Sequence, residues 1–427
     1  SFASFLISLN MVLYWRLVIL LICPYFAYAC TTFAIGKKAT ADGSVIVSHS
    51  DDSGTAQDAR LTHVPAADHV PNSVRHIYFA EEAFPRYVGK EFGPDYLPNL
   101  LPGFNMSVPI GEIPQVSHTF AYHDTAYGVM NEHNVAIGES TCSAMFKTCA
   151  KGTKIGCEEG RSVGEALMSI DTLSKIAMER STSAREAVKL MGRLAEEYGF
   201  YGTQDPNGDG EALQVGDSDE AWTFHILADP TGRSAIWAAR RVPDENATVL
   251  SNMFTIREVD VNDTANCLAS SNIYSIAQER GWWRPGELLD FTRVYSNGEY
   301  ANKYYSGRRM WGAFRLMKPS LKLSPDYDNL RYDRMWPWSV KPDKLVTPQD
   351  VMSWHRDYYQ GTKFDMTKTP AAGPFGTPDR FATSTEEVQG AWERTIAIYR
   401  TDLVHVQQLR TVTDDMPREL AGVLWFG

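Results

Sequence analysis

The stretch that decides the fold reads Cys30-Thr-Thr-Phe-Ala-Ile-Gly36, Lys37-Lys-Ala-Thr-Ala-Asp-Gly43 and Ser44-Val-Ile-Val-Ser-His-Ser-Asp-Asp52. Two β-rich segments, 31–36 and 44–50, flank an Asp-Gly turn signal, which predicts an antiparallel hairpin. The hairpin would return residues 49–52 toward Cys30. We therefore expect a thiol, an imidazole and two carboxylates to meet at one strand end.

The segment before Cys30 has the features of a signal peptide. Arg16 precedes a short apolar run, residues 17–23, and Ala27-Tyr28-Ala29 matches a small-residue cleavage site. Seven apolar residues are too few to span a bilayer, which needs about 20. We predict that residues 1–29 are removed, which makes the protein secreted or lumenal (extracellular, periplasmic or lysosome-like). An apolar first helix is the alternative.

Composition describes a folded globular protein with an acidic surface. The 427 residues are 44% hydrophobic and 22% charged, which are ordinary globular values. The formal net charge of −11 repels phosphate backbones, so a nucleic-acid partner is not expected. No linker or internal repeat divides residues 30–427, so we expect a single domain there and leave a homo-oligomer open.

Cleavage after Ala29 would give Cys30 a free α-amine beside its thiol. An amine with a pKa of about 7.7–8.0 accepts a proton at neutral pH, so such a residue carries its own base for nucleophilic catalysis. Two other interpretations remain: chance, because A-x-A cleavage precedes many small residues, and a lipid anchor. The anchor is disfavoured because Ala27 stands where a lipobox prefers leucine.

The pattern Cys-Thr-Thr-x-x-x-Gly-Lys-Lys-Ala-x-x-Asp-Gly-Ser from Cys30 resembles the start of the C69 dipeptidases, which are N-terminal nucleophile hydrolases. Further motifs of that family follow in the same order over the rest of the chain. They are Trp222-Thr-Phe-His-Ile-Leu227 with Val242-Pro-Asp244, Asn252-Met-Phe-Thr-Ile-Arg257-Glu258, Arg308-Arg309-Met-Trp311, Ser339-Val-Lys-Pro-Asp343, His355-Arg-Asp357-Tyr-Tyr with Gly361-Thr, Ala371-Ala-Gly-Pro-Phe-Gly376 and Trp392-Glu-Arg-Thr395.

The resemblance implies catalytic roles for four residues. Cys30 corresponds to the nucleophile and amine base, and Asp52 sits where related amidases hold an Asp near that amine. Asn252 follows a strand and matches the Asn of the oxyanion hole, where a neutral amide suits acyl transfer. Arg309 matches an Arg that faces the site in bile-salt-hydrolase-like relatives.

The resemblance also implies substrate-binding positions. Asp51 could hold the α-amine of Cys30 or of a bound peptide. The segment that contains Glu139 and Thr141 lines the pocket in relatives. Many members have Arg-Asn before the acidic pair, where this chain has His49-Ser50. Either His49 replaces the cation or donor, or the substrate preference differs.

Structural interpretations of the same residues stay open. Asp51 and Asp52 could cap the hairpin, Asn252 could close a turn, and Arg308 with Arg309 could be surface charges or carboxylate partners.

Relatives commonly continue beyond Leu424-Trp-Phe-Gly427, which suggests a missing C-terminal piece. After removal of residues 1–29, four cysteines besides Cys30 would remain, which is compatible with two disulfides in an oxidising compartment; they are Cys142, Cys149, Cys157 and Cys267.

Elsewhere the sequence predicts ordinary elements. We expect strand pairs at 126–141 and 222–239, an amphipathic helix from a Ser183/Glu186 capping box to Tyr198, and a helix from Thr347 to about Tyr359. Six prolines between Phe84 and Pro114 predict an irregular excursion, which could cover the substrate cleft.

Competing motifs are weaker. Gly160-Arg-Ser162-Val-Gly164 fits a nucleophile elbow, but no apolar strand precedes it, and Ser162 with Glu165 fits a helix cap instead. Asp205-Pro-Asn207-Gly-Asp209 matches half a calcium loop whose twelfth position is Gly216, so an acidic turn is favoured. H-E-x-x-H and C-x-x-C motifs are absent, so the sequence indicates neither a metal nor a cofactor.

The resemblance therefore implies an α+β protein, a four-layer αββα sandwich of two antiparallel sheets flanked by helices. It implies a cysteine-type dipeptidase that acts on dipeptides or short peptides through an acyl-enzyme. Two alternatives are an amidase for non-peptide N-acyl substrates and a lipid-anchored binding protein without catalysis.

Overall fold

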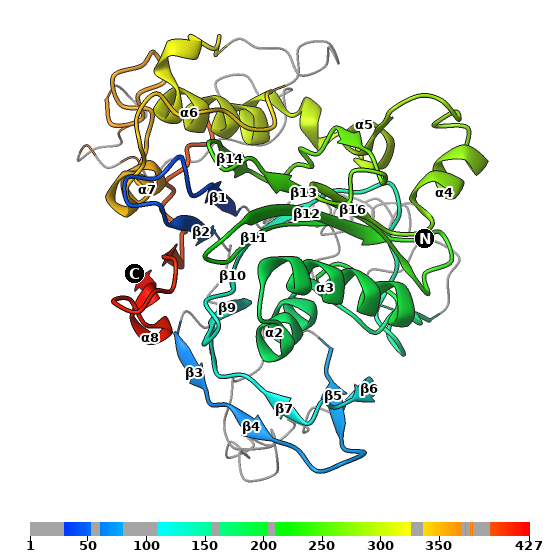
Figure 1. Ribbon diagram of the computed structural model, residues 1–427. Helices are drawn as coiled ribbons and strands as arrows, with labels where there is room; N and C mark the ends of the chain where they lie inside the picture. Colours follow the sequence, from blue (N-terminus) through cyan, green and yellow to red (C-terminus); the bar gives the residue numbers. More distant parts are fainter. Residues whose placement is uncertain are drawn as a thin grey trace, which may run out of the picture.

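The computed structural model describes most of the chain after Ala29. The described residues are 30–52, 60–79, 109–154, 163–203, 210–325, 336–368, 372, 376, 378 and 393–427. They form an α+β fold with two large antiparallel sheets (Figure 1). The predicted signal peptide, 1–29, lies outside them.

The smaller sheet contains the predicted hairpin, and its strands run β14-β1-β2-β18-β19. Their bounds are β14 Ala247–Leu250, β1 Thr31–Ile35, β2 Val45–Asp51, β18 Leu403–Leu409 and β19 Gly422–Phe426. Thr31 pairs with Ser50 and Thr32 with His49, which confirms the hairpin. Strand β18 pairs with β2 on the side of the hairpin away from β1. Leu403, for example, pairs with Asp51, although the two residues are far apart in sequence.

The larger sheet has eight strands in the order β16-β13-β12-β11-β10-β9-β8-β3. Their bounds are β16 Cys267–Ala269, β13 Ala235–Val242, β12 Ala221–Ala228, β11 Gly210–Gly216, β10 Ala136–Cys142, β9 Gly128–Asn131, β8 Tyr122–Asp124 and β3 Thr62–Val64. Both predicted strand pairs are confirmed, as β9 with β10 and β12 with β13.

Three two-stranded ribbons accompany the sheets. They pair β4 Ala67–Asp68 with β7 His118–Thr119, β5 Val74–Ile77 with β6 Gly111–Pro114, and β15 Glu258–Val259 with β17 Leu289–Asp290. The β6 strand shows that the predicted irregular excursion is wrong at its carboxyl end. Residues 84–108 of that excursion lie outside the described part of the chain.

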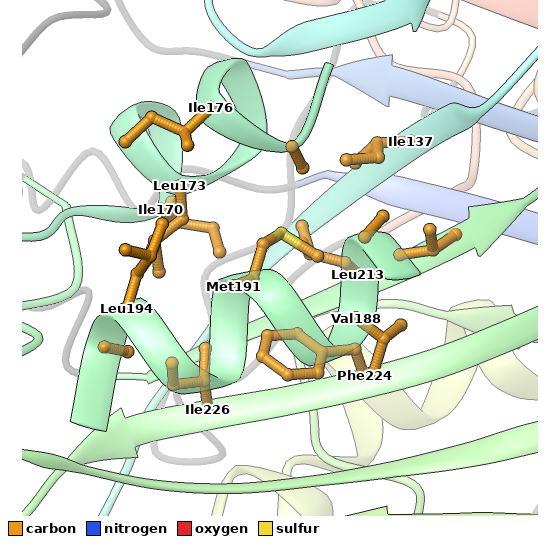
Figure 2. Packing of buried hydrophobic residues seen from close by; sticks show 14 of the residues in the cluster. Ile137, Ile170, Leu173, Ile176, Val188, Met191, Leu194, Leu213, Phe224 and Ile226 are labelled. Carbon is orange, nitrogen blue, oxygen red and sulfur yellow. The ribbon is translucent and has the colours of Figure 1, made fainter. Parts of the chain in front are cut away.

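Helices α2 (Ile170–Arg180) and α3 (Ala184–Tyr198) pack on one another and on the larger sheet (Figure 1). Their apolar faces meet the sheet in one core, which Figure 2 shows with Met191 pointing toward Leu213. Helix α3 confirms the predicted amphipathic helix. Its Ser183 caps Glu186 N, but the Glu186 carboxylate accepts from Thr182 N, so the reciprocal half of the predicted capping box is displaced by one residue.

Helices α6 (Arg308–Met317) and α7 (Pro348–His355) pack on the smaller sheet. The capping box of α7 forms between Thr347 and Asp350, but the helix ends at His355, four residues before the predicted end. Three shorter helices are α4 Ile273–Glu279, α5 Phe291–Tyr295 and α8 Arg418–Ala421. A π-helical turn, Lys303–Gly307, leads into α6.

One local prediction is wrong. Gly164, Ala166 and Met168 form isolated bridges, so no helix opens at Glu165; the next helix begins at Ile170 with Ser169 as its cap. Gly216 ends strand β11, which agrees with the rejection of the calcium loop, and the acidic turn stays a prediction. Residues 160–162 and 205–209 lie outside the described ranges. None of the helices described is long and apolar enough to cross a membrane.

The two sheets pack directly against one another. Strands β1 and β2 contact β10 and β11, and alanine, valine and leucine side chains from both sheets form one buried cluster. Gly138 of β10 is the tightest point, because a Cβ there would lie 2.4 Å from Thr32 Oγ1 and 2.5 Å from the Ser48 carbonyl oxygen. Backbone atoms of the hairpin therefore touch the strand that carries Glu139.

Replacing Gly138 with alanine tests this contact. We expect Gly138→Ala to lower the free energy of unfolding by about 1–3 kcal/mol, because the hairpin must move away from β10. Thermal unfolding followed by circular dichroism measures the loss. Gly111→Ala is the matched control, since its Cβ would meet only the flexible end of Leu167. Equal unfolding temperatures for the two variants would contradict the close sheet contact.

Candidate active site

The hairpin brings three reactive side chains together. The Cys30 Sγ, a ring nitrogen of His49 and a carboxylate oxygen of Glu139 all lie within 4.8 Å of one another. His49 Nε2 is 3.5 Å from Glu139 Oε2. Cys30 precedes β1, His49 lies near the end of β2, and Glu139 comes from β10 of the other sheet. All three are buried, with at most 1% of each residue exposed.

Glu139 is the centre of this polar cluster. Thr141 Oγ1 donates a hydrogen bond of 2.8 Å to Glu139 Oε1. Burial raises the pKa of Glu139, but hydrogen bonds from His49 and Glu211 outweigh the burial and leave its pKa below the ordinary value. Glu211 is fully buried on β11 opposite Thr141.

The surroundings of Cys30 disfavour its thiolate. Burial, and then the negative charges of Glu139, Asp51 and Asp52, raise the pKa of Cys30 well above the ordinary value. The electrostatic potential at the sulfur is therefore negative. A cation placed beside the sulfur would be attracted to this position and would favour the thiolate.

Arg309 ties the start of β1 to the end of β14. Its guanidinium has five N–H donors. They reach the Tyr305 carbonyl, the Cys30 carbonyl at 2.8 Å, Thr31 Oγ1, the Ser251 carbonyl and Asn252 Oδ1 at 2.7 Å. Burial, and then the nearby Arg394, lower the pKa of Arg309 to about 10, so it stays charged at neutral pH.

Asn252 follows strand β14 in a left-handed conformation with φ of 55°, as an Asn in a turn can. Its backbone N–H donates to Ser140 Oγ at 2.8 Å, and its side-chain Nδ2 donates to the Thr141 carbonyl at 2.7 Å. Because Arg309 only donates, it fixes the amide oxygen on its own side and directs Nδ2 toward β10. Asn252 therefore lies in a turn, as one prediction has it, and its side chain also contacts Thr141 and Arg309 of the candidate site.

Asp52 is held in a buried ion pair. Arg394 Nη2 donates to Asp52 Oδ2 at 2.5 Å, and Thr401 Oγ1 donates to Oδ1 at 2.5 Å. Neither Asp52 nor Arg394 exposes its side chain to solvent. Arg308, in contrast, pairs with Glu393, as the carboxylate-partner interpretation predicts.

The structure gathers all eight predicted site residues in one region. Asp51 is the last residue of β2, and its negative charge contributes to the raised pKa of the Cys30 thiol. Asn252 Nδ2 donates a hydrogen bond to the carbonyl of Thr141 on β10. Arg394 and Glu211 were missed. Arg394 lies in the quoted Trp392-Glu-Arg-Thr motif, which gave a family signal but no role. Glu211 lies inside a buried strand, and an acidic residue in such a strand indicates a functional or paired position, because Glu is rarely buried without a partner.

The expectation of two disulfides among the four cysteines is wrong. Cys142 and Cys267 are free and buried, whereas Cys149 is in a disulfide. Strands β10 and β16 carry the free thiols, and three strands of the larger sheet lie between them. Two cysteines so placed cannot meet the short Cα separation of a disulfide.

Comparison with known proteins identifies the family of this chain. A model of one peptidase family matches residues 29–83 and 99–427, so the protein is a peptidase. The family is peptidase family C69, and the chain belongs to it, because the match covers most of its length.

Individual relatives are more distant. A probable dipeptidase of Latilactobacillus sakei is 26% identical over 405 residues, which are 93% of this chain and 71% of that protein. A probable dipeptidase of Salmonella dublin is 26% identical over 396 residues, 90% of this chain and 74% of that one. Dipeptidase A of Lactobacillus helveticus is 22% identical over 402 residues, with 93% and 72% covered.

The Asp52–Arg394 pair gives a stability prediction. Arg394→Met leaves a buried carboxylate without its cation, and we expect a loss of about 3–5 kcal/mol in the free energy of unfolding. The double variant Asp52→Asn with Arg394→Met should recover much of that loss. Thermal unfolding measures both. Arg233→Met is the control, because Arg233 and its partner Glu165 are exposed. An Arg394→Met protein as stable as this control would contradict the buried pair.

Proposed function

We propose that this protein is a cysteine-type dipeptidase in which Cys30 is the nucleophile and its own α-amine the base. The observation that carries the proposal is the convergence of the Cys30 thiol with His49 and Glu139 at the start of β1. Membership of family C69 and relatives named dipeptidase support it. We also infer the four-layer αββα sandwich of N-terminal nucleophile hydrolases, because helices pack on the outside of both sheets.

Removal of residues 1–29 activates the thiol. With the preceding segment attached, buried carboxylates keep the proton on sulfur. Cleavage creates an α-amine three bonds from Sγ, and this amine takes the thiol proton. The resulting ammonium is stabilised by the same carboxylates that disfavour the thiolate in the uncleaved chain. One cleavage therefore supplies both the base and the compensating charge.

The chemistry then follows the order of acyl transfer. The Cys30 thiolate attacks the peptide carbonyl carbon, and the developing oxyanion is stabilised by Asn252 Nδ2 with backbone N–H groups. The ammonium of Cys30 returns its proton to the leaving amine, which departs and leaves a thioester. Water, deprotonated by the same amine, hydrolyses the thioester and releases the N-terminal amino acid of the dipeptide.

Arg309 acts as a positioning residue. All five of its N–H groups are directed to protein acceptors, among them the Cys30 carbonyl and Asn252 Oδ1. It holds the nucleophile and the oxyanion donor in one rigid frame, and such a frame is what effective catalysis requires. Asp52, anchored by Arg394, orients the Cys30 amine.

The charge of the site favours dipeptides over N-acyl conjugates. A dipeptide carries a free α-ammonium, whereas an N-acyl substrate has a neutral acyl group in the same place. The potential of Asp51 and Glu139 is negative around Cys30, which attracts the ammonium. His49 faces Glu139 at 3.5 Å and occupies a position where many relatives have Arg. Thr141 fixes the other oxygen of Glu139.

Replacing the proposed nucleophile tests the mechanism. We expect Cys30→Ser to lower kcat/KM for Ala-Ala-type dipeptides by at least about 1,000-fold, because a hydroxyl is a far weaker nucleophile than a thiolate. Cys267→Ala removes another buried free thiol and should keep full activity. N-acyl amino acids, assayed in parallel, should be hydrolysed slowly by every variant. Wild-type activity in Cys30→Ser would overturn the proposal.

Export and processing give an independent prediction. The exported protein should begin Cys-Thr-Thr-Phe in N-terminal sequencing, because cleavage after Ala29 frees the Cys30 amine. Intact mass and alkylation should show one unmodified N-terminal thiol. Ala29→Arg, which disrupts the small-residue cleavage site, should yield uncleaved protein without dipeptidase activity. An acylated Cys30, or an active protein that starts elsewhere, would contradict the amine base.

A further inference from the structure

The cluster at Cys30 has the composition of a metal site. A thiol, an imidazole and a carboxylate are the three side-chain types that bind Zn²⁺ in proteins. Within the described ranges, Cys30, His49 and Glu139 are the group in which three such atoms gather within 4.8 Å. Their spacing in sequence is 19 and 90 residues, so no local zinc motif reveals them.

Two of the three ligand atoms are already spaced as a bound ion requires. His49 Nε2 and Glu139 Oε2 belong to buried side chains and face one another at 3.5 Å. Tetrahedral Zn²⁺ with bonds of about 2.0–2.2 Å to nitrogen and oxygen separates two ligands by about 3.4 Å. The observed separation therefore leaves an ion equidistant from both atoms at normal bond lengths.

The surrounding charge favours a cation. Asp51 and Asp52 are buried carboxylates that follow the ligand His49 at the end of β2. A divalent ion with a Cys thiolate and a Glu carboxylate has a neutral inner shell. Thr141 holds the second oxygen of Glu139, which orients the first toward the ion.

We propose that Cys30, His49 and Glu139 form an inhibitory site for a thiophilic divalent cation, for which Zn²⁺ is the best match. Binding forms Zn–S, Zn–N and Zn–O bonds, and the thiol proton is released to solvent, with no change in oxidation state. The sulfur that is proposed to attack the peptide is then coordinated, so metal and substrate exclude one another.

The processed chain should bind more tightly than the uncleaved one. A free Cys30 amine, which rests on the proposed function, closes a five-membered chelate ring with Sγ and adds a fourth ligand. The coordination of the ion is then complete without water, as in closed structural zinc sites. In the uncleaved Ala29→Arg chain the same nitrogen is an amide and is not a ligand.

Cobalt titration tests the site without an activity assay. The purified exported protein, titrated with Co²⁺, should show a thiolate-to-metal charge-transfer band in the near ultraviolet and intense visible bands of four-coordinate Co²⁺. Cys30→Ser should lose the charge-transfer band. His49→Gln and Glu139→Gln should each weaken binding at least about 10-fold. Cys267→Ala, which keeps all three ligands, should give the wild-type spectrum.

Zn²⁺ should then displace Co²⁺ and abolish dipeptide hydrolysis, and a chelator should restore it. Circular dichroism checks that each variant is folded, and the two single glutamine variants serve as independent tests if one fails to fold. A charge-transfer band that persists in Cys30→Ser, or wild-type affinity in both glutamine variants, would overturn the site. If Co²⁺ binds as expected but no dipeptide is hydrolysed, the metal site stands and only the proposed function fails.

Discussion

The buried guanidinium of Arg309 is the interaction on which the rest of the site depends. It joins three parts of the chain that are far apart in sequence: the start of β1, the end of β14 and helix α6. A charge buried this deeply is tolerated only when every donor is used, and all five are. The same bonds that stabilise the charge also fix the Cys30 backbone and the Asn252 amide. Stability and active-site geometry therefore share one set of contacts.

Around this guanidinium, buried ionisable groups lie beside partners. Asp52 pairs with Arg394, and Glu139 faces His49 at 3.5 Å. Removing a partner exposes the full desolvation cost of the remaining charge. This arrangement explains why so many ionisable groups occur within one core: each alone would be costly, and together they set a negative potential at one sulfur atom.

Local patterns in the sequence predicted much of this arrangement. The Asp-Gly turn indicated that Cys30, His49 and Asp52 meet, and the family motifs indicated Asn252 and Arg309. The missed residues depend on tertiary contacts. Arg394 reaches Asp52 only because β18 pairs beside β2, and Glu211 meets Glu139 only through the β10–β11 register. The two expected disulfides failed for the same reason, since cysteine counts carry no distances.

The negative potential at Cys30 connects catalysis, processing and metal binding. In the proposed mechanism, this potential keeps the thiol protonated while residues 1–29 are attached. After the proposed cleavage, the same potential would stabilise an ammonium, whether on Cys30 or on a peptide. A site built to attract a cation beside a thiolate also attracts a thiophilic metal ion, because Zn²⁺ satisfies the same electrostatic demand and adds bonds to sulfur. Sensitivity to such ions is thus a physical consequence of how the nucleophile is activated.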